Sequence, residues 1–470
     1  MTLNSNFTIV IAGGGFCGMM ALVQLIRKTK FPSEIILINK GYSVACGIAF
    51  QSYTNSHLLN VEGRNMSAFP DDPDHFVNWI KLNYADRYAE SEIPTTYFPR
   101  NLYGYYLQQV LNQAMQNAPD HLKVRIVQDE ITAIVPEYGF LRVDTLSKNS
   151  FRADKIILAT GNSEPGPPLL KENTFLQSKN YYSNPWTENA VLGLQHDDTV
   201  LIIGNGLTMV DVVIGLRDKN FTGNIISLSP RGFNILPHRK AQPQKYILDD
   251  LQPPYSLDHL FLIFHKHIRR AHENGMHGET VVDAMRAKTQ EIWQQLSLPD
   301  KRKFMTHLRH LWGVARHRLP ETIYNQMQNE IASNKLKVLA GRIQAIEVLK
   351  THFTVSFTGR KDQLKNSIQV ARIINCTGPQ TDIRKMNSTL YDNMLKQGIV
   401  KSDEMNLGIY AMPDGRVIDN SGNTSESIFA LGSLLKGTLW ESTAVPELRI
   451  QADRVTDLLL DSATMKLTQS

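Results

Sequence analysis

The sequence contains one local unit twice, about 190 residues apart. In each copy a short apolar run, residues 7–12 or 200–203, is followed by a glycine-rich turn and then by apolar residues at helical spacing. The turns contain Gly13, Gly15 and Gly18 in the first copy, and Gly204 and Gly206, followed by Leu207 and Thr208, in the second. A strand, a glycine turn and a helix together expose backbone N–H groups at the helix N-terminus, where a pyrophosphate can bind. The sequence therefore predicts two dinucleotide sites.

Each copy also closes with a similar segment. Residues 153–161 read A-D-K-I-I-L-A-T-G, and residues 371–378 read A-R-I-I-N-C-T-G. In doubly wound folds, ligands bind at the carboxyl ends of the parallel strands. We therefore expect cofactor contacts where these segments end, at Ala159, Thr160, Gly161 and Gly378.

A chain of 470 residues is longer than a single hydrophobic core usually supports. The repeated unit predicts an α/β fold with two Rossmann-like dinucleotide-binding domains. We expect residues 1–165 and 373–470 to form an FAD-binding domain and residues 166–372 to form an NAD(P)-binding domain. Within the second domain, a helical insertion is expected at about residues 236–330.

The insertion has helix signals and a basic charge. Ser256 and Thr280 are expected to cap two of its helices, and Pro320 to end a third. The segment from Arg231 to Arg318 holds 15 Lys or Arg residues against 8 Asp or Glu residues, whereas the whole chain has a net charge of +5. Two interpretations stay open: a basic lining for an anionic cofactor or substrate, or the solvated faces of surface helices.

Composition excludes several classes of protein. With 42% hydrophobic residues, the sequence is ordinary for a globular protein, and no apolar run approaches the length of a membrane span. We expect a cytoplasmic protein that acts on a small molecule and does not bind nucleic acid; a homo-oligomer stays open. The three cysteines form no C-x-x-C pair, which argues against a thiol-disulfide reductase. Nine of the 14 histidines lie between His238 and His317, but no Cys or paired carboxylate completes a metal site there.

The residues that usually select the nucleotide differ from the common pattern. An Asp or Glu about 20 residues after the first glycine turn commonly binds the ribose, but Asn39 and Lys40 stand there. We expect both residues at the cofactor, where Asn39 can still hydrogen-bond a ribose hydroxyl but holds it less firmly without charge assistance. After the second copy's next strand comes Arg231, which suits a 2′-phosphate better than a free ribose hydroxyl. The sequence therefore favours NADPH over NADH. Thr208 and Asp211 have the spacing of a helix-capping box.

Several longer motifs carry a family resemblance. They are G-I-A-F at 47–50, H-L-L-N-V at 57–61, C-T-G-P at 376–379 and W-E-S-T-A-V-P-E-L-R at 440–449. With these motifs the sequence resembles the bacterial FAD/NAD(P)-binding oxidoreductase-like family, which is related to flavin monooxygenases. The resemblance runs nearly end to end and implies a three-layer flavoprotein architecture like that of glutathione reductase. It does not imply a substrate.

The resemblance also implies where the cofactors bind. His57 and Asn60 would lie beside the flavin ring as contacts or proton-handling groups, although a structural, hydrogen-bonded histidine is the alternative. The helix that starts near Val445 and Pro446 would direct its N-terminus at the flavin and stabilise the reduced ring. Further implied flavin contacts are Phe16, Cys17, Gly47, Ala49, Met66, Gly432, Ser433, Trp440 and Glu441. Ser433 occupies a place where related flavoproteins often have an Asp.

These observations lead to one functional hypothesis and two alternatives. The hypothesis is an FAD-dependent oxidoreductase, reduced by NADPH, that uses O2 to oxygenate a small amine, sulfur or carbonyl compound. The first alternative is a flavin or nucleotide sensor that binds a partner without turnover. The second is an oxidase or dehydrogenase that never oxygenates.

Overall fold

A computed structural model describes residues 7–41, 43–239 and 246–469. The chain divides into two compact units, each made from more than one segment. Unit 1 comprises Met1–Ser52, Val61–Ser163 and Thr381–Ser470, and unit 2 comprises Tyr53–Asn60 and Glu164–Gln380. The expected boundaries at 165 and 372 therefore differ from those of the structure. In addition, the short segment of residues 53–60, which we call the strap, belongs to unit 2.

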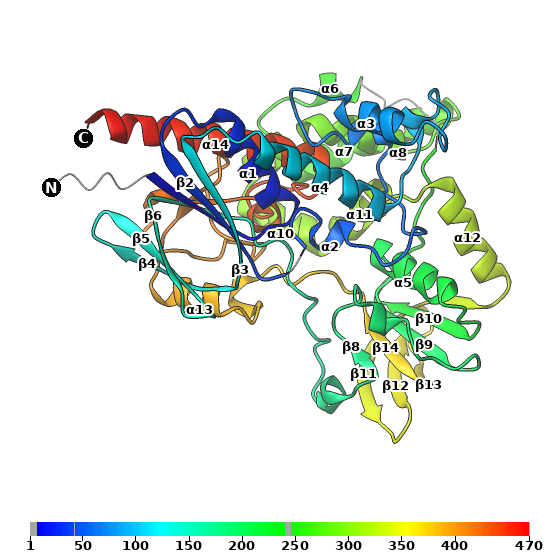
Figure 1. The fold of residues 1–470 in the computed structure, drawn as a ribbon. Helices are drawn as coiled ribbons and strands as arrows, with labels where there is room; N and C mark the ends of the chain where they lie inside the picture. Colours follow the sequence, from blue (N-terminus) through cyan, green and yellow to red (C-terminus); the bar gives the residue numbers. More distant parts are fainter. Residues whose placement is uncertain (1–6, 42, 240–245, 470) are drawn as a thin grey trace. The chain divides into compact units, whose positions relative to one another are not determined.

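Unit 1 is built on a six-stranded sheet that is parallel except at one edge (Figure 1). Its strand order is β15 (Arg416–Ile418), β16 (Thr424–Ala430), β7 (Lys155–Leu158), β1 (Phe7–Ala12), β2 (Ser33–Asn39) and β3 (Leu122–Gln128). Every residue of β1 and β7 is buried, as expected for central strands that are covered on both faces. This burial explains why apolar and polar residues do not alternate along residues 7–12.

Two further layers cover the sheet of unit 1. On one face, α1 (Phe16–Lys28) packs against α4 (Arg100–Gln116) and α14 (Val445–Gln469). On the other face, an antiparallel sheet and one helix share a core with β1, β2 and β7; these elements are β4 (Ile131–Glu137), β5 (Phe140–Thr145), β6 (Ser150–Ala153) and α13 (Thr389–Lys396). The smaller helices of this unit are α2 (Gly47–Phe50) and α3 (His75–Asn83). Unit 1 thus has the expected three layers.

Unit 2 contains a seven-stranded sheet whose central strands are parallel. Its order is β13 (Lys365–Val370), β12 (Phe353–Gly359), β11 (Leu336–Val348), β10 (Asn224–Ser229), β9 (Thr199–Ile203), β14 (Arg372–Asn375) and β8 (Tyr181–Tyr182). One face packs against α5 (Leu207–Asp218) and α12 (Glu321–Ala332). Because β14 pairs with β9, the closing strand of the second copy belongs to unit 2, and the boundary falls after it.

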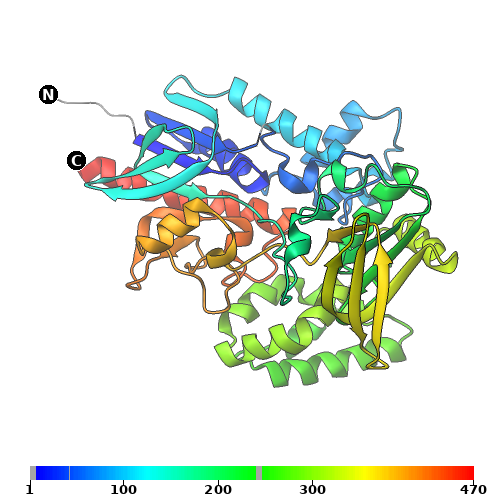
Figure 2. The same ribbon diagram turned by 90° about the horizontal axis from the view of Figure 1, so that it is seen from below.

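The helical insertion of unit 2 lies between β10 and α12. Figure 2 shows its helices in green, gathered into one bundle. They are α6 (Ile247–Asp250), α7 (Leu257–Glu273), α8 (Glu279–Ala284), α9 (Thr289–Gln295), α10 (Leu298–Lys303) and α11 (Arg309–Arg316). Ser256 caps α7 as predicted, because its hydroxyl oxygen accepts a hydrogen bond from the His259 N–H at 3.3 Å.

Two other helix signals in the insertion are wrong. Thr280 lies inside α8, where its hydroxyl donates to the His277 carbonyl at 2.7 Å, and Gly278 is the N-cap. The single helix expected after it is broken into α8, a tight 3₁₀ turn and α9. Pro320 does not end a helix but stands at the N-cap of α12, a position that suits a residue without an N–H donor.

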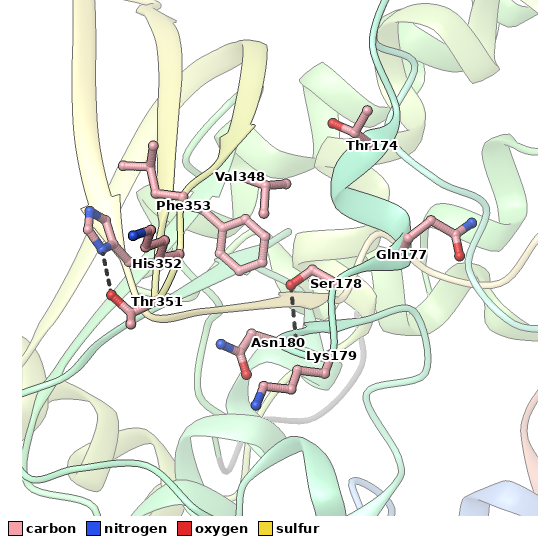
Figure 3. A pocket seen from close by; sticks show the side chains of 11 residues that line it. Thr174, Gln177, Ser178, Lys179, Asn180, Val348, Thr351, His352 and Phe353 are labelled. Carbon is pink, nitrogen blue, oxygen red and sulfur yellow. Dashed lines mark hydrogen bonds between the residues drawn. The ribbon is translucent and has the colours of Figure 1, made fainter.

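Unit 2 contains a pocket whose lining includes no residue of the second glycine turn (Figure 3). It has a volume of about 370 Å³ and is bordered by Thr174–Gln177, Ser178 and the turn between β11 and β12. Its polar side chains interact with near neighbours: the Ser178 hydroxyl accepts from the Asn180 N–H at 3.3 Å, and Thr351 contacts His352 at 3.1 Å. No predicted site residue lines this pocket.

Candidate functional site

The first glycine turn connects β1 to α1 and is closely packed. Gly13 has a φ of +103°, and a β-carbon added there would lie 2.5 Å from the Ala159 carbonyl oxygen. A β-carbon on Gly18 would lie 1.9 Å from the Gly13 carbonyl oxygen. Both distances are far below van der Waals contact, so only glycine fits at these two positions.

The end of this turn is open to a ligand. Gly15 is the N-cap of α1, no side chain caps the helix, and no acidic residue lies in its first turn. A β-carbon on Gly15 would meet only the Gly47 α-carbon, at 3.7 Å. The backbone N–H groups and the helix dipole therefore suit an anion such as a pyrophosphate.

The second glycine turn connects β9 to α5 in unit 2. Gly204 has a φ of +111°, and an added β-carbon would lie 2.4 Å from the Cys376 carbonyl oxygen. Gly206 is the N-cap of α5, and a β-carbon there would have no neighbour within 4 Å. Again, no side chain caps the helix and no acidic residue lies in its first turn. The capping box expected from Thr208 and Asp211 is therefore wrong.

The two turns share one hydrogen-bond pattern. The Gly13 N–H donates to the neighbouring strand at Ile38 over 2.8 Å, and the Gly204 N–H donates to Leu228 over 2.9 Å. After the turn, each closing strand donates back to the first strand: Ala159 to Ala12 and Cys376 to Ile203, each at 2.8 Å. The residues that follow, Gly161 and Gly378, have φ values of +74° and +93°. The predicted duplication is thus confirmed in the backbone.

Replacing Gly204 with alanine should strongly destabilise unit 2, because the β-carbon meets a backbone oxygen that cannot move aside. We expect a loss of at least about 3 kcal/mol in the free energy of unfolding. Gly206→Ala is the matched control, since its β-carbon enters open space and its φ of −86° suits any residue. Urea denaturation of both variants measures the difference; equal stabilities would contradict the packing described here.

Asn39 holds the first glycine turn in place. Its side-chain oxygen accepts a hydrogen bond from the Gly14 N–H at 2.9 Å, and its amide nitrogen donates to the Gly41 carbonyl at 2.8 Å. Lys40 is 73% exposed and pairs with Glu130 at 3.5 Å on the surface. The structure therefore gives Asn39 a local role in shaping the turn, and contact with a ribose stays a prediction for both residues.

Three other predicted residues of unit 1 meet at the start of α1. A β-carbon on Gly432, whose φ is +73°, would lie 2.8 Å from the Cys17 sulfur. On the other side, Gly47 approaches Gly15. Residues far apart in the sequence therefore meet beside the first helical turn, and contact of these residues with a flavin stays a prediction.

The remaining predicted residues of unit 1 differ in exposure. Thr160 and Gly161 are exposed, and the Thr160 hydroxyl contacts the Tyr391 hydroxyl at 2.5 Å. Trp440 is 6% exposed and has the Lys436 ammonium over its ring at 5.4 Å, so it packs as a core residue. Met66, Phe16 and Val445 are also buried, whereas Ala49, Ser433 and Glu441 are exposed or half-buried.

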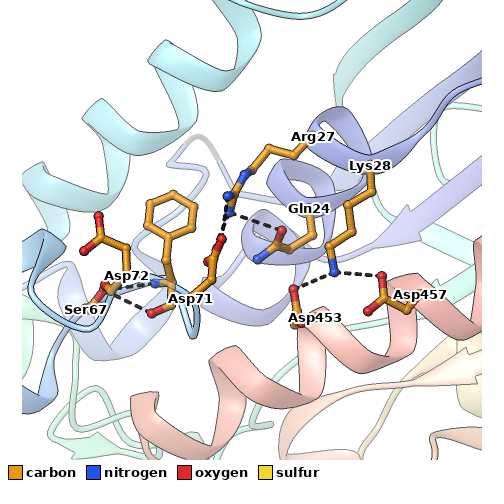
Figure 4. A network of polar contacts seen from close by, with 9 residues as sticks. Gln24, Arg27, Lys28, Ser67, Asp71, Asp72, Asp453 and Asp457 are labelled. Atoms are coloured by element: carbon orange, nitrogen blue, oxygen red, sulfur yellow. Dashed lines mark hydrogen bonds and ion pairs between the residues drawn. The ribbon is translucent and has the colours of Figure 1, made fainter.

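Charged residues anchor the helix that carries the first turn. Figure 4 shows the Lys28 ammonium of α1 between Asp453 and Asp457 of α14, at 2.6 and 2.7 Å. Partial burial disfavours the charged amine, but the hydrogen bonds to both carboxylates outweigh it and raise the pKa of Lys28. Arg27 pairs with Asp71 at 2.8 Å. These contacts fix the C-terminal end of α1, opposite the glycine turn.

The strap places His57 and Asn60 in unit 2. His57 is 3% exposed, its Nε2 donates to the Asp211 carbonyl at 2.8 Å, and its ring packs edge-on against Tyr53. The Asn60 carbonyl accepts a hydrogen bond from His238 Nε2 at 3.0 Å. This geometry supports the alternative that His57 is a structural histidine, because it fastens the strap to α5. Contact of either residue with a flavin stays a prediction.

His238 lies in a buried cluster of charged residues. Arg318 is 7% exposed and donates to both oxygens of Asp283 at 2.6 Å. Burial of His238, followed by the charge of Arg318, lowers the pKa of its imidazole to about 4. A neutral His238 is therefore part of the folded state at neutral pH.

This pKa predicts an acid sensitivity of unit 2. The unfolded histidine, with a pKa of about 6.5, binds its proton before the folded one as the pH falls. The contribution of His238 to the free energy of unfolding is therefore fully present above pH 6.5 and declines toward pH 4. At pH 5 the decline should reach about 2 kcal/mol. Urea denaturation at pH 7.5 and pH 5 tests this, with His238→Gln as the control that keeps the donor to Asn60. An identical pH dependence in the variant would contradict the prediction.

The cysteines are not activated nucleophiles. All three are free thiols. Desolvation raises the pKa of Cys17 to about 12 and also raises the pKa values of Cys46 and Cys376. Thiols with raised pKa values stay protonated at neutral pH and react slowly in disulfide exchange.

Among the described residues, no group of three or more His, Cys, Asp or Glu side chains is arranged to bind a metal ion. Within the same ranges, no helix combines the length and the apolar character needed to cross a membrane.

A known family model matches the first part of the chain. Residues 10–163 match the FAD-NAD(P)-binding family model, which confirms the resemblance for this segment. No curated protein matches the sequence.

Solved structures share the fold at low sequence identity. L-Lysine 6-monooxygenase from Pseudomonas syringae has a TM-score of 0.66 and 16% identity, over 97% of this chain and 99% of that one. Ornithine N-hydroxylase from Kutzneria sp. 744, with reduced FAD, NADP+ and L-ornithine, has a TM-score of 0.63 and 12% identity, over 99% and 100%. Bacillithiol disulfide reductase from Bacillus cereus has a TM-score of 0.55 and 13% identity, over 97% and 99%. The flavoprotein fold predicted from the sequence is confirmed.

Proposed function

We propose that this protein is an FAD-dependent oxidoreductase that is reduced by NADPH and uses O2 to hydroxylate a small molecule. The observation that carries the proposal is the pair of glycine turns, one in each unit, with matching backbone hydrogen bonds and an uncapped helix behind each. The family match of residues 10–163 and the fold shared with flavin-dependent hydroxylases support it.

The residues of unit 1 fit FAD. The N–H groups at the start of α1 would bind the pyrophosphate, and Gly13 and Gly18 leave no room for side chains that would displace the turn. The N-terminus of α14, at Val445, would favour negative charge on the flavin ring. Bound FAD would supply the hydride acceptor and the reaction with O2.

The residues of unit 2 fit a nicotinamide dinucleotide in the same manner. The open face of Gly206 and the uncapped start of α5 would bind the pyrophosphate. Arg231, two residues after the end of β10, would bind the 2′-phosphate of NADPH. The two units would thereby hold the reductant and the flavin on separate sites.

O2 is a better electron acceptor for this protein than a disulfide. One structure of the same fold is a disulfide reductase, so electron transfer to a disulfide has to be considered as the alternative. Here, however, the three cysteines form no C-x-x-C pair, and their pKa values are raised. We propose a primary amine as the first substrate class to test, because the similar structures include an ornithine N-hydroxylase, an L-lysine 6-monooxygenase and a cadaverine monooxygenase.

Anaerobic stopped-flow spectroscopy tests the proposal. Protein loaded with FAD and mixed with NADPH should lose its absorbance near the flavin maximum much faster than free FAD does under the same conditions. Reduction no faster than that of free FAD would contradict the proposal and favour a sensor without turnover. If reduction is fast, O2 uptake and peroxide yield with an amine panel separate a hydroxylase from an oxidase, since an oxidase returns all its O2 as peroxide.

A further inference from the structure

The loop after β10 is fastened to the second glycine turn. Asn205, between the two glycines of that turn, donates its side-chain amide to the Phe233 carbonyl. The Ser229 hydroxyl accepts from the Gly232 N–H at 3.0 Å, and Gly232 has a φ of +61°. These contacts hold residues 231–233 beside the place where a bound dinucleotide would begin. Arg231 is therefore kept close to the cofactor turn.

The helical insertion contacts the same loop. Arg231 donates a hydrogen bond from Nη2 to the Thr306 carbonyl at 3.1 Å. Thr306 belongs to a π-helical turn, Phe304–Leu308, whose wide bond runs from the Arg309 N–H to the Phe304 carbonyl. Such turns are uncommon and are frequently found at functional sites. The π turn is followed by a second arginine, Arg309, which begins α11.

In the part of the chain that the structure describes, Arg231 and Arg309 form hydrogen bonds to Thr306 and His310 and have no acidic partner. Across the described ranges, no carboxylate forms an ion pair with Arg231 or Arg309. Burial, followed by the nearby charge of Arg231, lowers the pKa of the Arg309 guanidinium. Two neighbouring guanidinium groups without a counter-charge repel each other, and a dianion between them relieves that repulsion.

We infer that Arg309, supplied by the insertion, acts together with Arg231 to bind the 2′-phosphate of NADPH and sets the preference over NADH. This inference rests on the proposed function, because it assigns the ligand of the second glycine turn. A phosphate monoester carries nearly two negative charges at neutral pH, and arginine binds it through two parallel hydrogen bonds. The insertion therefore has a role in cofactor selection.

Binding measurements without turnover test the inference. Adenosine 2′,5′-bisphosphate and AMP differ only in the 2′-phosphate, so calorimetry with the two compounds isolates this contact. Arg309→Gln should weaken binding of the bisphosphate at least about tenfold and leave AMP affinity unchanged. Arg309→Lys keeps the charge and should retain part of the affinity. Arg302→Gln, at an exposed position of α10, is the matched control and should bind as the wild type does.

Each outcome separates this inference from the broader proposal. If Arg309→Gln binds both compounds as the wild type does, Arg309 plays no part and the inference fails. If the variant is folded by circular dichroism but its affinity for both compounds falls equally, Arg309 does not recognise the 2′-phosphate, and the inference also fails. If the wild-type protein binds neither compound, the NADPH site itself is absent. Slow flavin reduction despite discrimination between the two compounds would contradict the proposed function but not this inference.

Discussion

Gly206→Val should abolish the use of NADPH while the flavin stays bound. Around Gly206 the structure has open space, with no atom within 4 Å of an added β-carbon, so the fold tolerates the substitution. The valine side chain would instead fill the space at the start of α5 that a pyrophosphate needs. We expect the KM for NADPH to rise at least about 100-fold, which corresponds to about 2.8 kcal/mol of binding free energy.

Steady-state kinetics and the flavin spectrum measure the two effects separately. Gly206→Ala should give a smaller increase in KM than the valine variant, because the obstruction is smaller. Loss of bound FAD from Gly206→Val would contradict the assignment of one nucleotide to each unit. An unchanged KM would show that the dinucleotide binds elsewhere.

Gly15→Val should abolish FAD binding. The β-carbon would meet only the Gly47 α-carbon, at 3.7 Å, so the fold tolerates it. The valine side chain would, however, occupy the face of α1 where its free N–H groups would bind a phosphate. We expect the Kd for FAD to rise at least about 100-fold and the protein to be purified without yellow colour.

Fluorescence titration with FAD measures this loss. Gly15→Ala is the second variant, which keeps the result interpretable if valine disturbs Gly47. Calorimetry with adenosine 2′,5′-bisphosphate is the control, because unit 2 should bind it normally in both variants. FAD affinity equal to that of the wild type would show that the flavin does not lie at the first glycine turn.

The parts of the fold that follow local rules were predictable from the sequence. A buried strand, a glycine turn and an amphipathic helix occupy consecutive residues, so the two cofactor turns and their closing strands could be recognised directly. Ser256 was recognised for the same reason, since an N-cap bonds to a residue three positions later.

Contacts between distant residues were not predictable in this way. The strap lies against α5, where a β-carbon on Gly215 would meet the Tyr53 hydroxyl at 2.1 Å, but more than 150 residues separate the two. His57 therefore belongs to unit 2, although its sequence neighbours belong to unit 1. The pairing of Arg231 with the π-helical turn before Arg309 has the same origin, because a π turn has no simple residue signature.

Asn39 shows how a missing carboxylate can be misread. From the sequence, the amide counts only as a weaker ribose ligand. In the structure it also accepts from the Gly14 N–H, so it shapes the turn that presents the helix N-terminus. Asn39→Ala should for this reason be considered a change to the turn as well as to the ribose site.

Unit 1 and unit 2 should each bind one dinucleotide at their own glycine turn. A crystal structure of the protein grown with FAD and NADP+ tests it most directly. We expect the FAD pyrophosphate at the N-terminus of α1, beside Gly13 and Gly15, and the NADP+ pyrophosphate at the N-terminus of α5, beside Gly204 and Gly206. Density for either pyrophosphate away from its glycine turn, or for both cofactors competing at one turn, would contradict it.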